Sequence, residues 1–208
     1  MNYKIQVQTK QLMKATLALC ITSLFLGTVL SGCLGDGFRT NNDEITLSSP
    51  TWTKSDFWEY SVKTSNLEVS TTMVVATDND ATDYYVGTGS LEDAKRHAVL
   101  NHNPALGRVQ ISDFAIYENN QPQKILDFPL KVSKSWSFSL YGEDEFVASV
   151  IDINNGKAEI SAVSDSGARL SYIFSQDARW LSYFEFINEN GEANLVMELA
   201  NYGTGFTG

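Results

Sequence analysis

Short segments rich in β-forming residues, separated by turn residues at nearly even spacing, constrain the fold of this chain more than any other feature. Asn155-Gly156 and Asn190-Gly191 each stand between two such segments, and Asn-Gly supplies the positive φ angles of a tight hairpin. Antiparallel strands in meander order are therefore expected from residue 135 onward. The six predicted strands are Ser135–Tyr141, Phe146–Ile153, Ala158–Asp165, Ala168–Ser175, Trp180–Asn188 and Ala193–Tyr202.

The first half of the chain carries weaker signals of the same kind. Four further strands are predicted there, and one short helix is predicted near residues 90–100. Ser90 suits the N-cap of this helix, with acidic residues in its first turn and basic residues after them, as the helix dipole favours. The four upstream strands are Phe57–Lys63, Leu67–Ala76, Tyr84–Gly87 and Gln110–Tyr117.

The distribution of apolar residues along the strands predicts a curved sheet. In residues 135–140 serine alternates with Trp136, Phe138 and Leu140, so one face is polar and the other apolar. In residues 180–187 strict alternation puts apolar residues on both faces. One face carries Trp180, Phe184 and Phe186, and the other carries Leu181, Tyr183 and Ile187. We expect a mainly β fold: a strongly curved antiparallel sheet, half-barrel or sandwich-like, of about nine to ten strands and largely a meander. It should form a single domain over residues 51–208.

The first 32 residues resemble a secretory signal peptide. They contain Lys4, Lys10 and Lys14, no acidic residue, and an apolar run from Thr16 to Leu30. As a helix, this run would rise only about 22 Å, which is short of the roughly 30 Å hydrocarbon core of a bilayer. A permanent spanning helix is therefore disfavoured, and export by a Sec-type signal is expected.

The tetrapeptide Leu30-Ser31-Gly32-Cys33 resembles the lipobox of secreted lipoproteins. The resemblance implies that the thiol of Cys33 receives a lipid and that a peptidase then cuts before this residue. The alternative is an ordinary signal cleavage site with an incidental cysteine. The only other cysteine, Cys20, is expected to be an apolar residue of the leader.

Cleavage before Cys33 would leave a strongly acidic chain without disulfides. The leader holds three of the 15 basic residues and none of the 25 acidic ones, so the mature chain carries a net charge of −13. Nucleic acid is not expected as a partner, and an anionic membrane surface would repel such a body. The membrane is therefore expected as a partner only through the lipid on Cys33, at the outer face of the cell membrane or at an envelope membrane.

The segment 33–50 is predicted to be a lipidated flexible linker, because it is rich in Gly, Asn, Ser and Thr. A coil of the 17 residues that follow Cys33 would reach on the order of 23 Å.

Three phrases in the mature chain carry a further resemblance. They are "DFWEYSV" near its start, "LDFPLKVSKSW" from Leu126 to Trp136, and "MELANY" from Met197 to Tyr202. Together they look like a group of secreted or lipid-anchored β-domains of unassigned function. Some of these are similar in build to the periplasmic lipoprotein carriers, whose half-barrel is closed by helices over an apolar cavity. This chain departs from the group at Ser133, where a glycine is common. It departs from the carriers in having only one predicted helix, where a closed carrier would have more.

The polar residues form no convincing catalytic or metal-binding motif. His97 and His102, with Asp93, could bind zinc, but a helix-end cation and a turn residue explain the two histidines as well. Asp78, Asp80 and Asp83 could bind calcium, although a solvated hairpin turn is the favoured interpretation. The G-x-S-x-G motif, phosphate-binding glycine loops and dinucleotide fingerprints are absent. We therefore predict neither an enzyme nor a bound metal or cofactor.

Aromatic residues at alternate strand positions are the remaining candidates for a binding site. Such rings could line a pocket for an acyl or isoprenoid chain, or they could fill a solid core. The residues concerned are Trp58, Tyr60, Trp136, Phe138, Tyr172, Phe174, Phe184 and Phe186.

The expected function is that of a non-catalytic lipoprotein of the cell envelope. It would bind an apolar ligand such as a lipid, or an envelope protein, through its curved aromatic-rich sheet. The alternative is a purely structural surface module with a solid core and no ligand, and a hydrolase is the least favoured class.

Overall fold

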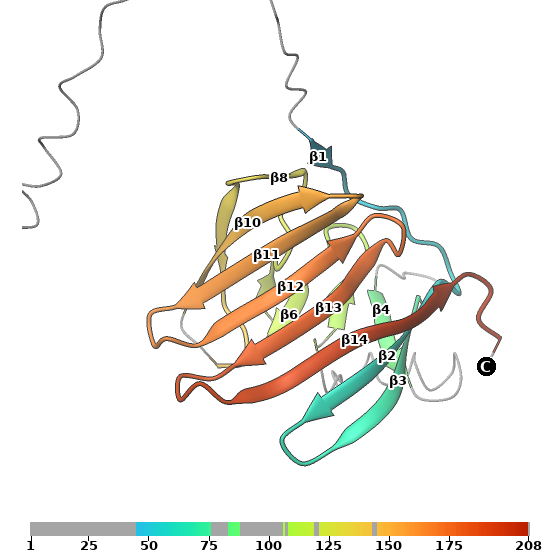
Figure 1. Cartoon of the computed structure of the whole chain (residues 1–208). Coiled ribbons are helices and arrows are strands. Elements are labelled where there is room, and N and C mark those ends of the chain that lie inside the picture. Colours follow the sequence, from blue (N-terminus) through green and yellow to red (C-terminus); the bar gives the residue numbers. More distant parts are fainter. Residues whose placement is uncertain are drawn as a thin grey trace, which may run out of the picture. The chain divides into compact units, whose positions relative to one another are not determined.

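The computed structural model describes residues 45–75, 83–87, 106, 108–118, 121–142 and 145–207. They belong to one compact unit, Asp43–Gly208, and all their regular structure is β (Figure 1). The helix expected near residues 90–100 and the leader with Cys33 lie outside the described residues. The strands are β1 (Thr46–Leu47), β2 (Phe57–Thr64), β3 (Glu68–Val74), β4 (Asp83–Gly87), β5 (Arg108–Gln110), β6 (Ile116–Glu118), β7 (Gln121–Gln123), β8 (Leu130–Lys131), β9 (Ser135–Phe138), β10 (Phe146–Asn154), β11 (Lys157–Ser164), β12 (Arg169–Ser175), β13 (Trp180–Ile187) and β14 (Ala193–Gly203).

Twelve of these strands form one antiparallel sheet, in the order β7-β6-β5-β4-β3-β2-β14-β13-β12-β11-β10-β9. The order consists of two meanders, β2–β7 and β9–β14. They are joined where the last strand, β14, pairs with β2, with Met197 opposite Val62. The predicted meander is therefore confirmed, and a long-range pairing links its two halves.

The strand bounds follow the predicted ones closely from β9 to β14. The β10–β11 hairpin turns at Asn155 and Gly156, whose φ angles of 49° and 71° are the positive values that the Asn-Gly signal predicts. Alternation is regular in β11, where every second residue is buried. In β9 the predicted one-sided pattern is confirmed, because Phe138 is buried while Ser135 and Ser137 are exposed.

The single strand predicted over Gln110–Tyr117 is wrong, because the chain reverses within it. Phe114 takes a φ of 59°, and its N–H bonds to the carbonyl of Gln110 at 2.9 Å. Asp113 Oδ1 accepts a hydrogen bond from the Ala115 N–H at 3.0 Å. This Asp-centred turn separates β5 from β6, which pair as a hairpin.

The sheet is strongly curved and does not close into a barrel. Figure 1 shows β4 and β6 behind the layer formed by the long strands β10–β14. The two ends of the sheet meet through a side chain: Gln123 of β7 accepts a hydrogen bond from the Ser139 N–H, just after β9, at 2.8 Å. The apolar core fills the inside of the curve.

The β body includes residues that the sequence analysis assigned to the linker. β1 pairs with β8 in a separate two-stranded sheet, with Leu47 opposite Leu130. Both leucines are buried and belong to the core. The folded body therefore begins before residue 51.

Strict alternation fails in β13. A register shift in its pairing with β12 leaves Ser182 as an extra residue between Leu181 and Tyr183. Leu181 is consequently fully buried, whereas Tyr183 and Ile187 are half-buried. The prediction that Leu181 shares the face of Tyr183 and Ile187 is therefore wrong, because a bulge reverses the alternation at that point.

Candidate functional site

The eight aromatic residues predicted as a pocket all lie in or against the core. Seven of them are buried, and Trp136 is half-buried against the same cluster. They contact other rings: Tyr172 lies 5.9 Å from Phe184, and Phe138 lies 5.8 Å from Phe146. Phe174 meets Phe128 edge-on at 5.1 Å. Within the described part of the chain, these rings fill space against one another.

The hydroxyl groups of two of these residues bond to the backbone across the core. Tyr60 donates its hydroxyl to the Leu181 carbonyl at 2.6 Å, and Tyr172 donates to the Ile125 carbonyl at 2.7 Å. Burial raises the pKa of Tyr60 and of Tyr172 well above that of an ordinary tyrosine, so both phenols stay protonated. These groups therefore hold distant segments together.

A shallow depression of about 200 Å³ lies elsewhere, between the β5–β6 turn and the segment before β8. Ser112, Asp113, Lys124 and Asp127 contribute to it, and none of the eight predicted aromatic residues lines it. Asp127 pairs with Lys134 at 2.8 Å, outside the depression. Both carboxylates that line the depression therefore already have partners. Asp127 pairs with Lys134, and Asp113 accepts a hydrogen bond within its own turn.

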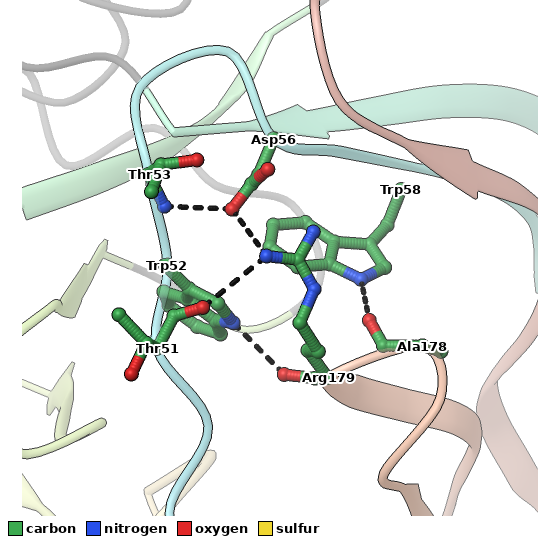
Figure 2. A network of polar contacts seen from close by, with 7 residues as sticks. All are labelled: Thr51, Trp52, Thr53, Asp56, Trp58, Ala178 and Arg179. Carbon is green, nitrogen blue, oxygen red and sulfur yellow. Dashed lines mark hydrogen bonds and ion pairs between the residues drawn. The ribbon is translucent and has the colours of Figure 1, made fainter.

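Sequence reasoning missed a polar network that fastens the segment before β2 and the start of β2 to the turn before β13. Figure 2 shows this network, which we call the clasp: Thr51, Trp52, Thr53, Asp56 and Trp58 on one side, Ala178 and Arg179 on the other. At its centre Arg179 Nη1 donates to Asp56 Oδ2 at 2.7 Å.

The remaining bonds of the clasp surround this ion pair. The Thr53 N–H donates to the same carboxylate oxygen at 2.7 Å, and Arg179 also reaches the Thr51 carbonyl at 3.2 Å. The indoles of Trp52 and Trp58 donate to the carbonyls of Arg179 and Ala178 at 2.8 and 2.6 Å. Asp56 is fully buried, so its charge depends on these donors.

Backbone conformations that non-glycine residues rarely adopt gather at the clasp. Arg179 belongs to the clasp and has a φ angle of 61°. Ser55 lies between Thr53 and Asp56 of the clasp and has a φ angle of 70°. Phe114, with its φ of 59°, packs on Trp52 at 4.6 Å. Such residues persist only where the surroundings determine them. The clasp is therefore a rigid point, and it fixes where the N-terminal segment joins the sheet.

The outer face of the sheet carries an apolar patch, defined here as Val147, Ile151 and Val163. Val147 of β10 stands directly opposite Val163 of β11, and they are 52% and 47% exposed. Ile151, 59% exposed, sits at a register shift of β10. Ser149 and Ser161, which face each other and are partly exposed, lie between the Val147–Val163 pair and Ile151. Exposed apolar side chains gathered on one face often mark an interaction site.

The other predicted sites fall largely outside the described residues. His97, His102, Asp78, Asp80 and the tetrapeptide ending at Cys33 all do so, and only the backbone of Asp83 is described, in β4. Among the described residues, no group of three or more potential metal ligands is present. No helix in this part of the chain has the length and hydropathy needed to cross a membrane.

Comparisons of the chain with protein-family models, with curated proteins and with solved structures find no match.

Proposed function

We propose that this protein is a lipid-anchored protein of the cell envelope that carries out no catalysis and binds a protein partner on the outside of its sheet. The leader directs export, the lipid sits on Cys33, and Leu30, Ser31 and Gly32 precede the cleavage point. The anchor keeps a body of net charge −13 beside a membrane that its own charge would not favour.

The packing of the interior is the observation that carries this proposal. An apolar ligand inside the curve would have to displace rings that already contact one another, such as Tyr172 and Phe184. It would also break the bonds that Tyr60 and Tyr172 make across the core. Binding on the outer face requires no such rearrangement, and the apolar patch supplies the contact area there.

The charges beside the patch indicate the chemistry of the partner. Asp152 of β10 and Glu159 of β11 are opposite each other and both exposed. Two facing carboxylates repel each other, and a cation from a partner would relieve that repulsion. The partner surface that fits is therefore apolar at its centre and basic at its rim.

Site-specific photo-crosslinking in intact cells tests this function. A photoreactive amino acid at Val163 should give one adduct of defined mass, and the same group at the exposed Ser70 of β3 should not. Replacing Asp152 and Glu159 by lysine should weaken the adduct several-fold. Absence of any adduct would instead favour a structural module, and a lipid bound inside the folded protein in native mass spectra would favour a carrier.

A further inference from the structure

Two exposed aliphatic side chains stand where the N-terminal segment enters the body. Ile45 directly precedes β1 and is 63% exposed, and Val132 directly follows β8 and is 42% exposed. One residue further in, Thr46 pairs with Lys131, and beyond them the buried Leu47 pairs with Leu130. We call Ile45 and Val132 the entry corner.

Val132 is held rigidly in this exposed position. It lies in a turn closed by a hydrogen bond from the Lys134 N–H to the Lys131 carbonyl at 3.0 Å. The next residue, Ser133, has a φ of 68° and donates its N–H to the Val150 carbonyl at 2.9 Å. Lys134 is further fixed by its 2.8 Å ion pair with Asp127. Turn positions usually carry polar residues, so an aliphatic residue fixed there needs an explanation.

The chain upstream of the entry corner limits how far it can lie from the proposed anchor. Twelve residues run from Cys33 to Glu44, and even a fully extended chain of that length spans at most about 43 Å. In Figure 1 the N-terminal segment enters the body at β1, which pairs with β8, whereas the β2–β3 turn lies at the opposite end. The entry corner can therefore lie no further than about 43 Å from the proposed anchor, which leaves it within reach of the bilayer surface.

The local charge agrees with this orientation. Lys131 and Lys134 flank the turn that carries Val132, in a mature chain whose net charge is −13. A lysine beside aliphatic residues suits the level of the lipid phosphates. Lys131 is exposed at this turn, whereas Lys134 is held by Asp127. Asp43 and Glu44 precede Ile45, so a zwitterionic surface suits the corner better than an anionic one.

We propose that the entry corner docks on the bilayer, with the side chains of Ile45 and Val132 inserted into its interface. This inference rests on the proposed lipid anchor, and it adds a fixed orientation: β1 and β8 face the membrane and the β2–β3 turn faces away. One acyl chain alone binds a membrane only marginally, and a second apolar contact strengthens attachment.

Fluorescence quenching by brominated lipids tests the docking. The full chain is expressed with a single added cysteine, purified after processing, labelled with a polarity-sensitive dye and placed in phosphatidylcholine vesicles. Dyes at Ile45→Cys and Val132→Cys should be quenched several-fold more than a dye at Leu67→Cys. Leu67 is a matched control because it is 57% exposed and lies in the β2–β3 turn.

A second variant separates insertion from mere closeness to the anchor. A dye at Thr46→Cys should be quenched in the otherwise unchanged protein and should lose most of that quenching when Ile45 and Val132 are both replaced by serine. Equal quenching at Leu67 and Val132, in protein whose intact mass shows the lipid, would overturn the docking and leave the anchor standing. An intact mass without the lipid would overturn both.

Discussion

Asp56 and Arg179 show how one pair of residues can hold together segments that lie 123 positions apart in the sequence. Asp56 is fully buried and Arg179 is its charged partner. Removing one member of a buried pair leaves the other charge without compensation, which typically costs about 3–5 kcal/mol. We expect Arg179→Met to lower the free energy of unfolding by about 3 kcal/mol, measured by urea denaturation.

The exposed pair Lys63–Glu68 provides the control. Its atoms are 3.9 Å apart and both side chains are about two-thirds exposed, so Lys63→Met should change stability little. An Arg179→Met protein as stable as the Lys63→Met protein would show that the clasp does not contribute to stability.

Tyr60 and Tyr172 make stability depend on pH in the alkaline range. Burial raises their pKa values well above the value of about 10 of an ordinary tyrosine, so above pH 10 the unfolded chain loses these protons while the folded chain keeps them. Below pH 10 these two tyrosines should therefore leave the free energy of unfolding unchanged. Above it, the value should fall by up to about 1.4 kcal/mol per pH unit for each tyrosine.

Urea denaturation at pH 9 and pH 11 measures this dependence. Tyr60→Phe should lose about 1–2 kcal/mol at pH 9, because the Leu181 carbonyl loses its donor. Between pH 9 and pH 11 the free energy of unfolding should fall less in the Tyr60→Phe variant than in the unchanged protein. An identical decline in both proteins would show that Tyr60 does not titrate on unfolding.

At the scale of elements, the bulge at Ser182 decides which side chains of β13 enter the core. Deleting Ser182 would restore regular alternation. The side chains of Trp180 and Leu181 would then each turn to the other face of the sheet. Both are fully buried, so we expect the deletion to prevent cooperative folding, seen as a lost transition in thermal denaturation. Ser182→Ala keeps the backbone and should fold normally. A deletion variant with a normal transition would contradict the assigned register.

The sequence predicts the strands well where local signals are sufficient. Alternation and the Asn-Gly turn locate β10 and β11, because both features act within a few residues. The bulge at Ser182 leaves no such signal, since it depends on how β13 pairs with β12. The reversal at Asp113 and Phe114 is not predicted either, because its turn signal is only the two residues Ser112 and Asp113 and strand-forming residues stand on both sides of them.

The aromatic residues could be chosen from the sequence, but what they contact could not. Alternation places Tyr172 and Phe184 on inward faces, and only the curvature of the whole sheet brings one ring against the other. The clasp was not predictable for the same reason. Asp56 stands in the apolar phrase "DFWEYSV", which hints at burial, yet nothing nearby points to Arg179.

At the scale of the whole molecule, the proposed anchor and the folded body should be separable. Leu47 is the first residue of the described core, 14 positions after Cys33 in the sequence. We expect Cys33→Ser to move the protein from the membrane pellet to the soluble fraction, with unchanged thermal denaturation. If the variant still sediments with membranes, the apolar leader has remained attached and cleavage before Cys33 is wrong.

The pairing of β14 with β2 also determines when this protein can fold. Until residues 193–203 are available, β2 and β13 each lack a neighbour, and the two meanders have no backbone ladder between them. Because β14 follows the other described strands of this sheet in the sequence, the sheet cannot be completed until all of them have been synthesised. The two half-sheets should therefore stay unjoined until β14 pairs with both β13 and β2.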